Sequence, residues 1–268
     1  MDAVAPAPSE IGSAPPQDAT DRGPIEAVWL GRIDYRDAWA LQKTLAAERA
    51  EGTIGDRLLL LEHPAVLTLG RHAEPGHVLA SPEELALRGI EVIRVERGGE
   101  VTYHGPGQLV AYPILALSRR GLLIRPFVRA LEGAMAETCA AFGVVAGRRD
   151  GHPGCWVDPD GAAPRKIGAL GIRVERGVSY HGIALNVAPN LADFDLIDPC
   201  GMPGLVSTSI AAETGLLEIA TTAAVEQAAS VFANALTIRL GADLGGFGSV
   251  GADRHAGRRV DVPHAAGR

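Results

Sequence analysis

A cysteine that could act as a nucleophile lies in the segment Asp195–Gly204, which reads DLIDPCGMPG. Pro199 and Gly201 flank Cys200, so neither a helix nor a central strand is expected to continue through it. A cysteine on such a turn is either a nucleophile or a small buried residue. A helix N-terminus or a nearby lysine would lower the pKa of its thiol and favour the reactive thiolate. The serine–threonine run 207–209 is placed to cap a helix at Ile210.

The chain has two further cysteines, and neither has such a setting. Cys139 lies in an apolar helical segment, which predicts core packing. Cys155 stands beside Trp156 and is predicted to be partly buried. Three cysteines without metal-site spacing and without an even disulfide framework indicate a reducing compartment. We therefore expect a cytoplasmic protein.

The segment Arg97–Gln108 (RGGEVTYHGPGQ) carries four glycines in twelve residues. Glycine allows a positive φ and lets the backbone approach a ligand closely. The segment also supplies hydrogen-bonding side chains, among them Thr102 and His104, beside the apolar strand 109–114. A β-turn with scattered polar groups is the alternative, but this density of polar groups favours a ligand-binding loop.

Two more segments combine glycine with a single basic side chain. In Arg165–Gly171 (RKIGALG), Lys166 is either an ordinary surface charge or a partly desolvated base. In Ser179–Asn186 (SYHGIALN), His181 is either a hydrogen-bonded histidine at a strand edge or a catalytic one. The residues alone leave both alternatives open.

The elements that must position these groups alternate unevenly between strand and helix. Apolar patterning and capping signals predict helices at 34–50, 81–89, 126–142 and 222–240 and strands at 25–30, 57–62, 90–95, 166–175 and 178–187. The run Leu58–Leu61 predicts a strand buried on both faces. The last two strands should form a hairpin at Arg176–Gly177. Together these elements predict an α+β fold with a mixed β-sheet and packed helices.

The chain is expected to form one folded domain between two tails. Residues 1–24 carry few large apolar side chains and predict a disordered N-terminal extension. Residues 25–244 form the predicted domain, and 245–268 are predicted to be a flexible C-terminal tail. The run Gly246–Gly251 (GFGSVG) matches a dinucleotide-binding pattern but follows a predicted helix, so we interpret it as chance.

Composition excludes several classes of function. The formal net charge of −7 argues against a nucleic-acid binder. Because there is no run of about eighteen apolar residues, no membrane span is expected. The chain also lacks a phosphate-binding loop, a His-Glu-x-x-His motif and a Cys-x-x-Cys pair, and its eight histidines are dispersed. No metal and no cofactor is predicted.

Four segments taken together resemble one family. They are Arg97–Gln108, Lys166–Gly171 (KIGALG), His181–Asn186 (HGIALN) and Asp198–Gly201 (DPCG), in the order and spacing of the lipoyl (octanoyl) transferases. The resemblance covers roughly 25–240. It implies the α+β fold of the biotin and lipoate protein ligase catalytic domain.

The resemblance also implies an activity. Members of the family transfer an octanoyl (or lipoyl) group from acyl carrier protein to a lysine of a lipoyl domain, the first step of endogenous lipoate synthesis. The implied acceptors are the lipoyl domains of 2-oxoacid dehydrogenase E2 subunits and the H protein of glycine cleavage. Exchange of one thioester for another needs no ATP.

The resemblance also implies which residues form the site, through their positions in the matching segments. Cys200 matches the cysteine that becomes acylated, and Lys166 matches the residue that acts as its acid and base. The positions that match the acyl-contacting segments are Arg97, Gly98, Gly99, Glu100, Val101, Thr102, Tyr103, His104, Ala169, Leu170, Gly171, Gly182, Ile183 and Ala184.

Some features of the chain differ from the family pattern or do not fit the partners that it implies. The match loosens after Gly201, and Cys155 occupies a position where an aliphatic residue is expected. The implied partners are acidic although this chain is itself negative. A local basic face could bind acidic partners despite the negative net charge; the alternative is that these basic side chains are merely solvated. The candidates for such a face are Arg148, Arg149, Arg165, Lys166 and Arg173.

Three other functions remain as alternatives. An ATP-dependent lipoate- or biotin-type ligase would need no cysteine at position 200. A cysteine thioesterase would pair Cys200 with His104 or His181 and pass the acyl group to water. A non-catalytic acyl-binding protein would bind the donor without forming a covalent adduct.

Overall fold

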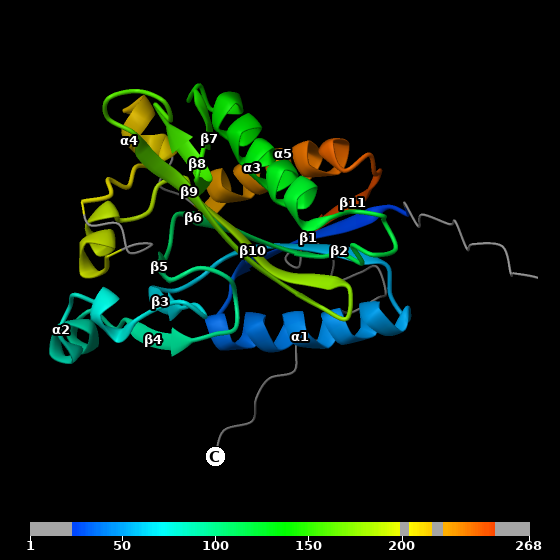
Figure 1. Cartoon of the computed structure of the whole chain (residues 1–268), viewed down its shortest axis with the longest axis horizontal. Helices are drawn as coiled ribbons and strands as arrows, with labels where there is room; N and C mark the ends of the chain where they lie inside the picture. The colour runs from blue at the N-terminus through cyan, green and yellow to red at the C-terminus, as the bar shows by residue number, and fades with distance from the viewer. Residues whose placement is uncertain (1–22, 199–203, 216–221, 250–268) are drawn as a thin grey trace, which may run out of the picture.

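The computed structural model describes residues 23–198, 204–215 and 222–249. A large mixed sheet forms the centre of the fold (Figure 1). The strand order is β11-β1-β2-β6-β10-β9-β8-β7. β1 pairs in parallel with β2 and β11, and the remaining neighbours are antiparallel. The predicted α+β class is confirmed. The strands are β1 (Ile25–Arg32), β2 (Asp56–Glu62), β6 (Gln108–Ile114), β7 (Ala146–Arg149), β8 (His152–Val157), β9 (Arg165–Glu175), β10 (Val178–Asn186) and β11 (Leu244–Ser249).

A smaller sheet lies beside the N-terminal end of α1 (Tyr35–Glu51) (Figure 1). Its order is β4-β3-β5, with β3 (Val66–Leu69) parallel to β4 (Glu91–Arg94) and antiparallel to β5 (Val101–His104). The short helices η1 (Pro75–His77), α2 (Pro82–Leu87) and η2 (Leu191–Leu196) complete this region. It brings the glycine-rich segment Arg97–Gln108, which contains β5, toward the large sheet.

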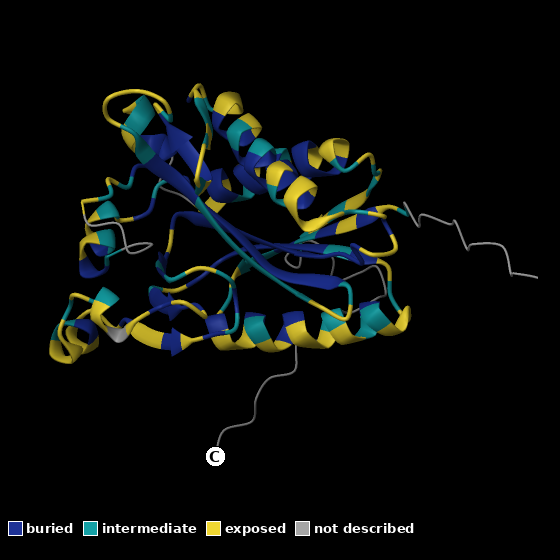
Figure 2. Cartoon of the chain, viewed as in Figure 1, coloured by how far each residue is buried: buried dark blue, intermediate teal, exposed yellow. Residues whose placement is uncertain are grey.

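Helices cover both faces of the large sheet. α3 (Ile124–Ala141) and α5 (Thr222–Arg239) pack on one face, and α1 lies on the other (Figure 1). The central strands β2, β6 and β10 are almost wholly buried (Figure 2). Leu58 and Leu60 join the core under α3 and α5, whereas Leu59 and Leu61 join the core under α1. The prediction of a strand buried on both faces is confirmed.

Local sequence signals account for the helix ends. Asp34 caps α1 by accepting a hydrogen bond from the N–H of Arg36, and Gly52 ends this helix with a φ of 82°. Ser81 caps α2, as its Pro-Glu-Glu continuation predicts. Ser209 caps α4 (Ile210–Thr214), so the predicted start at Ile210 is confirmed. α3 begins two residues before the predicted Pro126.

The predicted hairpin between β9 and β10 is confirmed. Arg176 and Gly177 have φ values of 50° and 79°, and two residues with positive φ form the turn whose twist suits a two-residue hairpin. The register pairs Leu170 with Ile183 and Gly171 with Gly182. The second and third motifs therefore lie side by side on neighbouring strands.

The predicted boundary at Leu244 is wrong. Residues 245–249 belong to β11, which pairs in parallel with β1 and places Gly246 opposite Glu26. The segment carries few large side chains, and composition therefore suggested a tail. Strand pairing uses backbone N–H and C=O groups, which glycine supplies as well as any residue. Residues 1–22 and 250–268 lie outside the described residues.

Two of the cysteines belong to the core under α3. Cys139 is fully buried, as predicted. Cys155 is also fully buried, whereas partial exposure was predicted, because α3 and Gly168 of β9 cover it. The Cys139 thiol and burial raise the pKa of the Cys155 thiol. Cys155 is therefore a packing residue and a poor nucleophile.

Candidate active site

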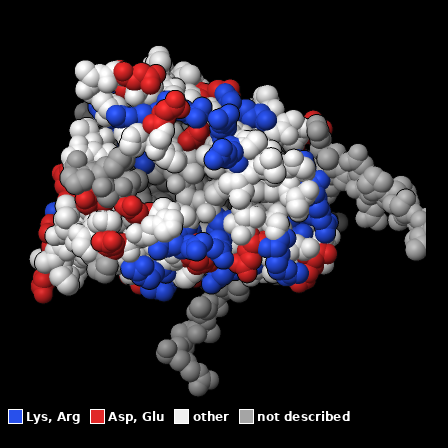
Figure 3. Space-filling view, viewed as in Figure 1, with Lys and Arg blue, Asp and Glu red and all other residues white. Residues whose placement is uncertain are grey.

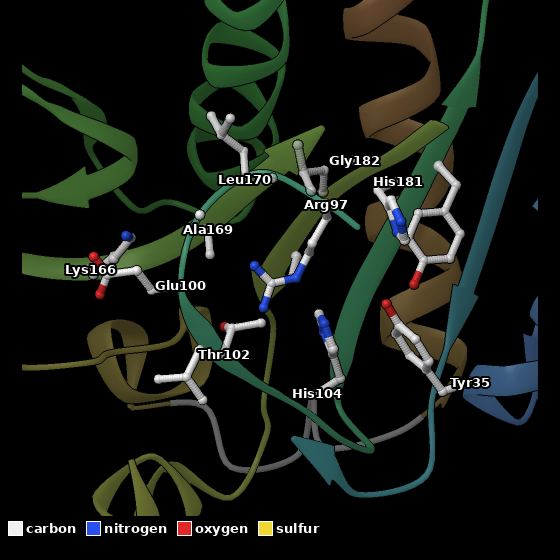
Figure 4. Close-up of a pocket in the computed structure, with 16 residues that line it drawn as sticks. Tyr35, Arg97, Glu100, Thr102, His104, Lys166, Ala169, Leu170, His181 and Gly182 are labelled. Atoms are coloured by element: carbon white, nitrogen blue, oxygen red, sulfur yellow. The ribbon is translucent and has the colours of Figure 1, made fainter. Parts of the chain in front are cut away.

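The glycine-rich segments meet around one pocket between the two sheets (Figure 4). It encloses about 510 Å³ of empty space, part of it open to solvent. Its lining is mostly apolar. Thirteen of the sequence-predicted residues line it: Arg97, Gly99, Glu100, Val101, Thr102, His104, Lys166, Ala169, Leu170, Gly171, Gly182, Ile183 and Ala184.

Close backbone contacts explain several of the glycines. A Cβ on Gly171 would lie 2.6 Å from the carbonyl oxygen of Gly98, and the N–H of Gly98 donates to Ile172 at 3.1 Å. A Cβ on Gly182 would lie 2.0 Å from the carbonyl oxygen of Ala111. Real Cβ atoms do not approach so closely, so both strands need glycine to pack here. Gly98 thus shapes the wall of the pocket without lining it.

Arg97 braces the loop that carries the first motif. The side chain is buried, and its Nη2 donates to the carbonyl of Thr68 at 2.6 Å and to the Thr68 hydroxyl at 2.9 Å. Its Nη1 donates to the carbonyl of Gly98 at 3.0 Å. These bonds hold a guanidinium charge in the wall beside Thr102 (Figure 4).

His104 belongs to a chain of buried hydrogen bonds. Its Nδ1 lies 2.8 Å from Gln108 Oε1, and the Gln108 amide donates to Asn186 Oδ1 at 2.9 Å. Asn186 in turn donates to the carbonyl of Thr208 at 2.9 Å. Since Gln108 Oε1 can only accept, the proton of His104 resides on Nδ1. Burial, followed by the neighbouring His63, lowers the pKa of His104 well below its usual value, so the ring is neutral.

An aromatic group at one end of the pocket was not predicted from the sequence. Tyr35 and Tyr112 line the pocket, and His63 lies behind them with its ring centre 4.9 Å from that of Tyr35. His63 Nδ1 lies 2.8 Å from the carbonyl of Ile33, so it donates there, and Nε2 accepts from the Tyr112 hydroxyl at 2.8 Å. Burial raises the pKa of Tyr35 to about 12. The available signal was a tyrosine inside the apolar strand 109–114.

The pKa of His63 implies a pH-dependent stability. Burial lowers this pKa from 6.5 to about 4. The unfolded chain therefore binds more protons than the folded chain between these values, and stability is lost as pH falls through this window. We expect a loss of about 2 kcal/mol from His63 alone between roughly pH 7.5 and pH 5.

Urea unfolding at both pH values would check this expectation. A His63→Gln variant removes the titrating group and should show a smaller difference in unfolding free energy than the unsubstituted protein. Carboxylates titrate alike in the two proteins, so the difference reports His63 together with its effect on the neighbouring His104. Equal pH dependence in both would contradict the expectation.

His181 is not at a strand edge, so the predicted alternative of a hydrogen-bonded histidine at such an edge is wrong. β10 lies between β6 and β9, and the side chain is 1% exposed. Neither ring nitrogen has a hydrogen-bond partner among the described residues. Burial lowers the pKa of His181 to about 4, so the ring is neutral. His181 therefore faces the pocket as an unsatisfied polar group.

Lys166 lies at the opposite end of the pocket from His181 and Tyr35 (Figure 4). The prediction of an ordinary surface charge is wrong, because Lys166 is 8% exposed. Its Nζ lies 5.3 Å from the centre of the Trp156 ring. Its backbone N–H donates to the carbonyl of Val206 at 2.8 Å, and its carbonyl accepts from Thr208 at 2.9 Å. Cys200 lies outside the described residues.

Tyr103, which was predicted to contact substrate, is not among the residues that line the pocket. Its side chain points away from the pocket because successive side chains of β5 alternate between two faces. The hydroxyl donates to Asp193 Oδ2 at 2.8 Å, and the ring packs 5.3 Å from that of Phe194. Tyr103 thus fastens η2 to the small sheet.

A Tyr103→Phe substitution should therefore affect stability rather than transfer. It removes a buried hydrogen bond to a carboxylate, and we expect a loss of about 1–2 kcal/mol in the free energy of unfolding, measured with urea. The KM for an acyl donor should change by less than about twofold. A large rise in KM with unchanged stability would instead indicate direct substrate contact.

No group of three His, Cys, Asp or Glu side chains suited to a metal ion occurs within the described residues. In the same part of the chain, no helix combines the length and apolar character that crossing a bilayer requires.

Residues 34–236 match the family model described as "Lipoyl protein ligase A/B catalytic domain". The chain is 54% identical to an octanoyltransferase from Chloroflexus aurantiacus over 188 residues, which is 70% of this chain and 83% of that protein. It is 44% identical to an octanoyltransferase from Corynebacterium efficiens over 221 residues, covering 80% and 84% of the two chains.

Solved structures share the fold at low sequence identity. A putative lipoate protein ligase from T. acidophilum with bound lipoic acid aligns with a TM-score of 0.59 at 14% identity, covering 85% of this chain and 90% of that one. A lipoate-bound protein from P. falciparum aligns with a TM-score of 0.62 at 10% identity over 84% of this chain and 66% of that one. These likenesses support the fold alone.

Proposed function

Since the chain belongs to the octanoyltransferases of the lipoyl protein ligase A/B catalytic domain family, we propose that it transfers an octanoyl group through an acyl-enzyme. The proposed donor is octanoyl–acyl carrier protein. The proposed acceptors are lysines of lipoyl domains in 2-oxoacid dehydrogenase E2 subunits and in the glycine cleavage H protein. The reaction would be the first step of endogenous lipoate synthesis, in the cytoplasm.

The proposed reaction has two balanced steps. The sulfur of Cys200 attacks the thioester carbonyl of the donor, the phosphopantetheine thiol leaves with a proton, and the octanoyl group stays on Cys200 as a thioester. The amine of the acceptor lysine then attacks this thioester, forming an amide and returning a proton to the sulfur of Cys200. Lys166 carries the proton in each step. No ATP or other cofactor takes part.

The observation that carries the proposal is the arrangement of the pocket. Small side chains of two neighbouring strands, Ala169, Gly171, Gly182 and Ala184, line a mostly apolar pocket that has Lys166 at one end. Such a surface suits a straight alkyl chain, because burial of methylene groups contributes about 0.8 kcal/mol each. The reacting carbonyl would then lie near Lys166.

Chain connectivity also supports the pairing of Cys200 with Lys166. Val206, whose carbonyl binds the N–H of Lys166, is six residues along the chain from Cys200. Thr208 returns a second backbone hydrogen bond to Lys166. Residues 206–208 are therefore anchored beside the lysine. A proton carrier is useful only within hydrogen-bond reach or one water of its partner.

The proposed partners are acidic, and this favours cationic docking residues. Lys and Arg side chains gather in one band over α1 and in another near α3 (Figure 3). Of the predicted basic face, Arg148 pairs with Glu132 at 2.8 Å and Arg165 pairs with Glu213 at 2.8 Å. Arg149 lies over Trp156 at 5.3 Å and forms no ion pair with another described residue. Arg149, which shares the Trp156 ring with Lys166, is thus placed to attract an anionic donor near Lys166.

Intact-mass measurement tests the proposal directly. The protein is mixed with octanoyl–acyl carrier protein in the absence of ATP and of acceptor, and the adduct is located by peptide mapping. We expect a mass increase of one octanoyl group on Cys200, discharged when an isolated lipoyl domain is added. An adduct on Cys139 or Cys155 would contradict the proposed nucleophile.

The same experiment separates the alternative functions. Transfer that requires free octanoate and ATP would indicate a ligase. Discharge of the adduct to octanoate without a lipoyl domain would indicate a thioesterase. Tight binding of the donor with no covalent adduct would indicate an acyl-binding protein.

A further inference from the structure

The backbone at His181 adopts an unusual conformation. Its φ is 55°, in the left-handed region that residues other than glycine rarely occupy. β10 pairs with β6 only from Ile183 onward, so the N–H of His181 has no partner on β6. It donates instead to Gln42 Oε1 of α1 at 2.8 Å. Such conformations persist where surrounding structure enforces them, and they concentrate at functional sites.

This local irregularity directs the imidazole into the pocket. His181 lines the pocket next to Gly182, and its ring is almost fully buried. Glu96 Oε1 lies 3.9 Å from Nε2, which is too far for a hydrogen bond. Two polar neighbours at this end are satisfied: His104 bonds Gln108, and the Tyr112 hydroxyl bonds His63. Both ring nitrogens of His181, in contrast, lack a hydrogen-bond partner among the described residues.

His181 lies where the far end of a bound acyl chain would be. Lys166 and His181 lie at opposite ends of the pocket (Figure 4). The strand register pairs His181 with Ile172, six residues along β9 from Lys166. Each added methylene brings the end of the chain closer to the imidazole.

We propose that His181 is a specificity-determining residue at the distal end of the acyl pocket, where its ring nitrogens disfavour longer apolar chains and accept a polar atom. This inference rests on the proposed octanoyl transfer. A buried imidazole must meet its hydrogen-bonding demand, and a methylene cannot do so. A chain that reaches His181 with a hydroxyl group can form a hydrogen bond with a nitrogen of the imidazole. A plain hydrocarbon of that length leaves both nitrogens without a hydrogen bond.

A chain-length series tests the proposal. Values of kcat/KM are measured for octanoyl, decanoyl, dodecanoyl and ω-hydroxydecanoyl thioesters of acyl carrier protein, with an isolated lipoyl domain as acceptor. The wild-type protein should prefer ω-hydroxydecanoyl to decanoyl. In His181→Phe, which keeps a flat ring without nitrogens, the ratio of decanoyl to octanoyl should rise roughly tenfold. The ratio of ω-hydroxydecanoyl to decanoyl should fall by a similar factor.

His181→Asn is the matched control variant. Asparagine tolerates a positive φ and keeps hydrogen-bonding groups, so the wild-type order of donors should be retained. Circular dichroism of both variants checks that they fold. If His181→Phe does not fold, the wild-type comparison still decides: a preference for decanoyl over ω-hydroxydecanoyl overturns the proposal. A uniform change for all donors in His181→Phe also overturns it.

A failure of the proposed octanoyl transfer can be distinguished from a failure of the inference about His181. No octanoyl transfer by the wild-type protein would reject the octanoyl-transfer proposal but not the role of His181. Calorimetric binding of decanoic and ω-hydroxydecanoic acids to the wild-type and His181→Phe proteins then gives the same comparison without catalysis. Stronger binding of the hydroxylated acid to the wild-type protein only would support the inference, and equal preference in both proteins would reject it.

Discussion

Replacing Lys166 with methionine is expected to lower the rate of octanoyl transfer by about 10²–10⁴-fold, the usual contribution of a general acid–base residue. Methionine keeps an unbranched side chain of similar length against Gly154 and Trp156, so the pocket wall should remain packed. Both half-reactions should slow, because the proposed role of Lys166 is to move a proton in each. Rapid-mixing mass spectrometry would measure formation and discharge of the acyl-enzyme separately.

The chain offers a matched control for this substitution. Its only other lysine, Lys43, also lies over a tryptophan, with Nζ 4.0 Å from the centre of the Trp39 ring, but it is exposed and outside the pocket lining. Lys43→Met should leave transfer within about twofold. Combining Lys166→Met with Cys200→Ser should add little to the loss from Cys200→Ser alone, because groups that act as one unit are not additive. Normal activity of Lys166→Met would remove Lys166 from the mechanism.

Replacing Gly182 with alanine is expected to destabilise the fold by about 3 kcal/mol or more. The added Cβ would lie 2.0 Å from the carbonyl oxygen of Ala111 and 2.8 Å from Pro113. The first contact is with the backbone of β6 in the middle of the sheet, so no flexible side chain can move aside. The pairing of β6 with β10 would have to shift, and this would displace His181 and Ile183.

Urea unfolding provides the measurement, with Gly55→Ala as its control. A Cβ on Gly55 meets no atom within 4 Å, so that substitution should change the free energy of unfolding by less than about 0.5 kcal/mol. A Gly182→Ala protein as stable as the control would mean that β6 and β10 can separate without cost.

Much of the site could be predicted from the sequence because its signals are local. Gly107 of the first motif, Gly171 of the second and Gly182 of the third are placed where close backbone contacts require glycine, as Gly171 against Gly98 shows. Helix caps such as Asp34 and Ser81, and the turn at Arg176–Gly177, act within a few residues. Such features need no knowledge of distant elements.

Residues that act through distant contacts were not predictable in this way. Tyr35 and Tyr112 come from α1 and β6, and only packing of the helix against the sheet brings them to one end of the pocket. Cys155 is buried because α3 crosses β8, which its neighbours in sequence do not reveal. β11 exists because β1 offers a free edge for backbone pairing.

The sequence by itself determined the family, the three glycine-rich segments and most helices and strands, because each depends on residue types over a short span. The tertiary structure alone decided which way the side chains face. Strand alternation points Tyr103 into the small-sheet core and His104 into the pocket, and a left-handed φ held by Gln42 points His181 at its end. Burial and unmet hydrogen bonds arise only when elements far apart in the chain are packed together, because the atoms that exclude water come from all of them.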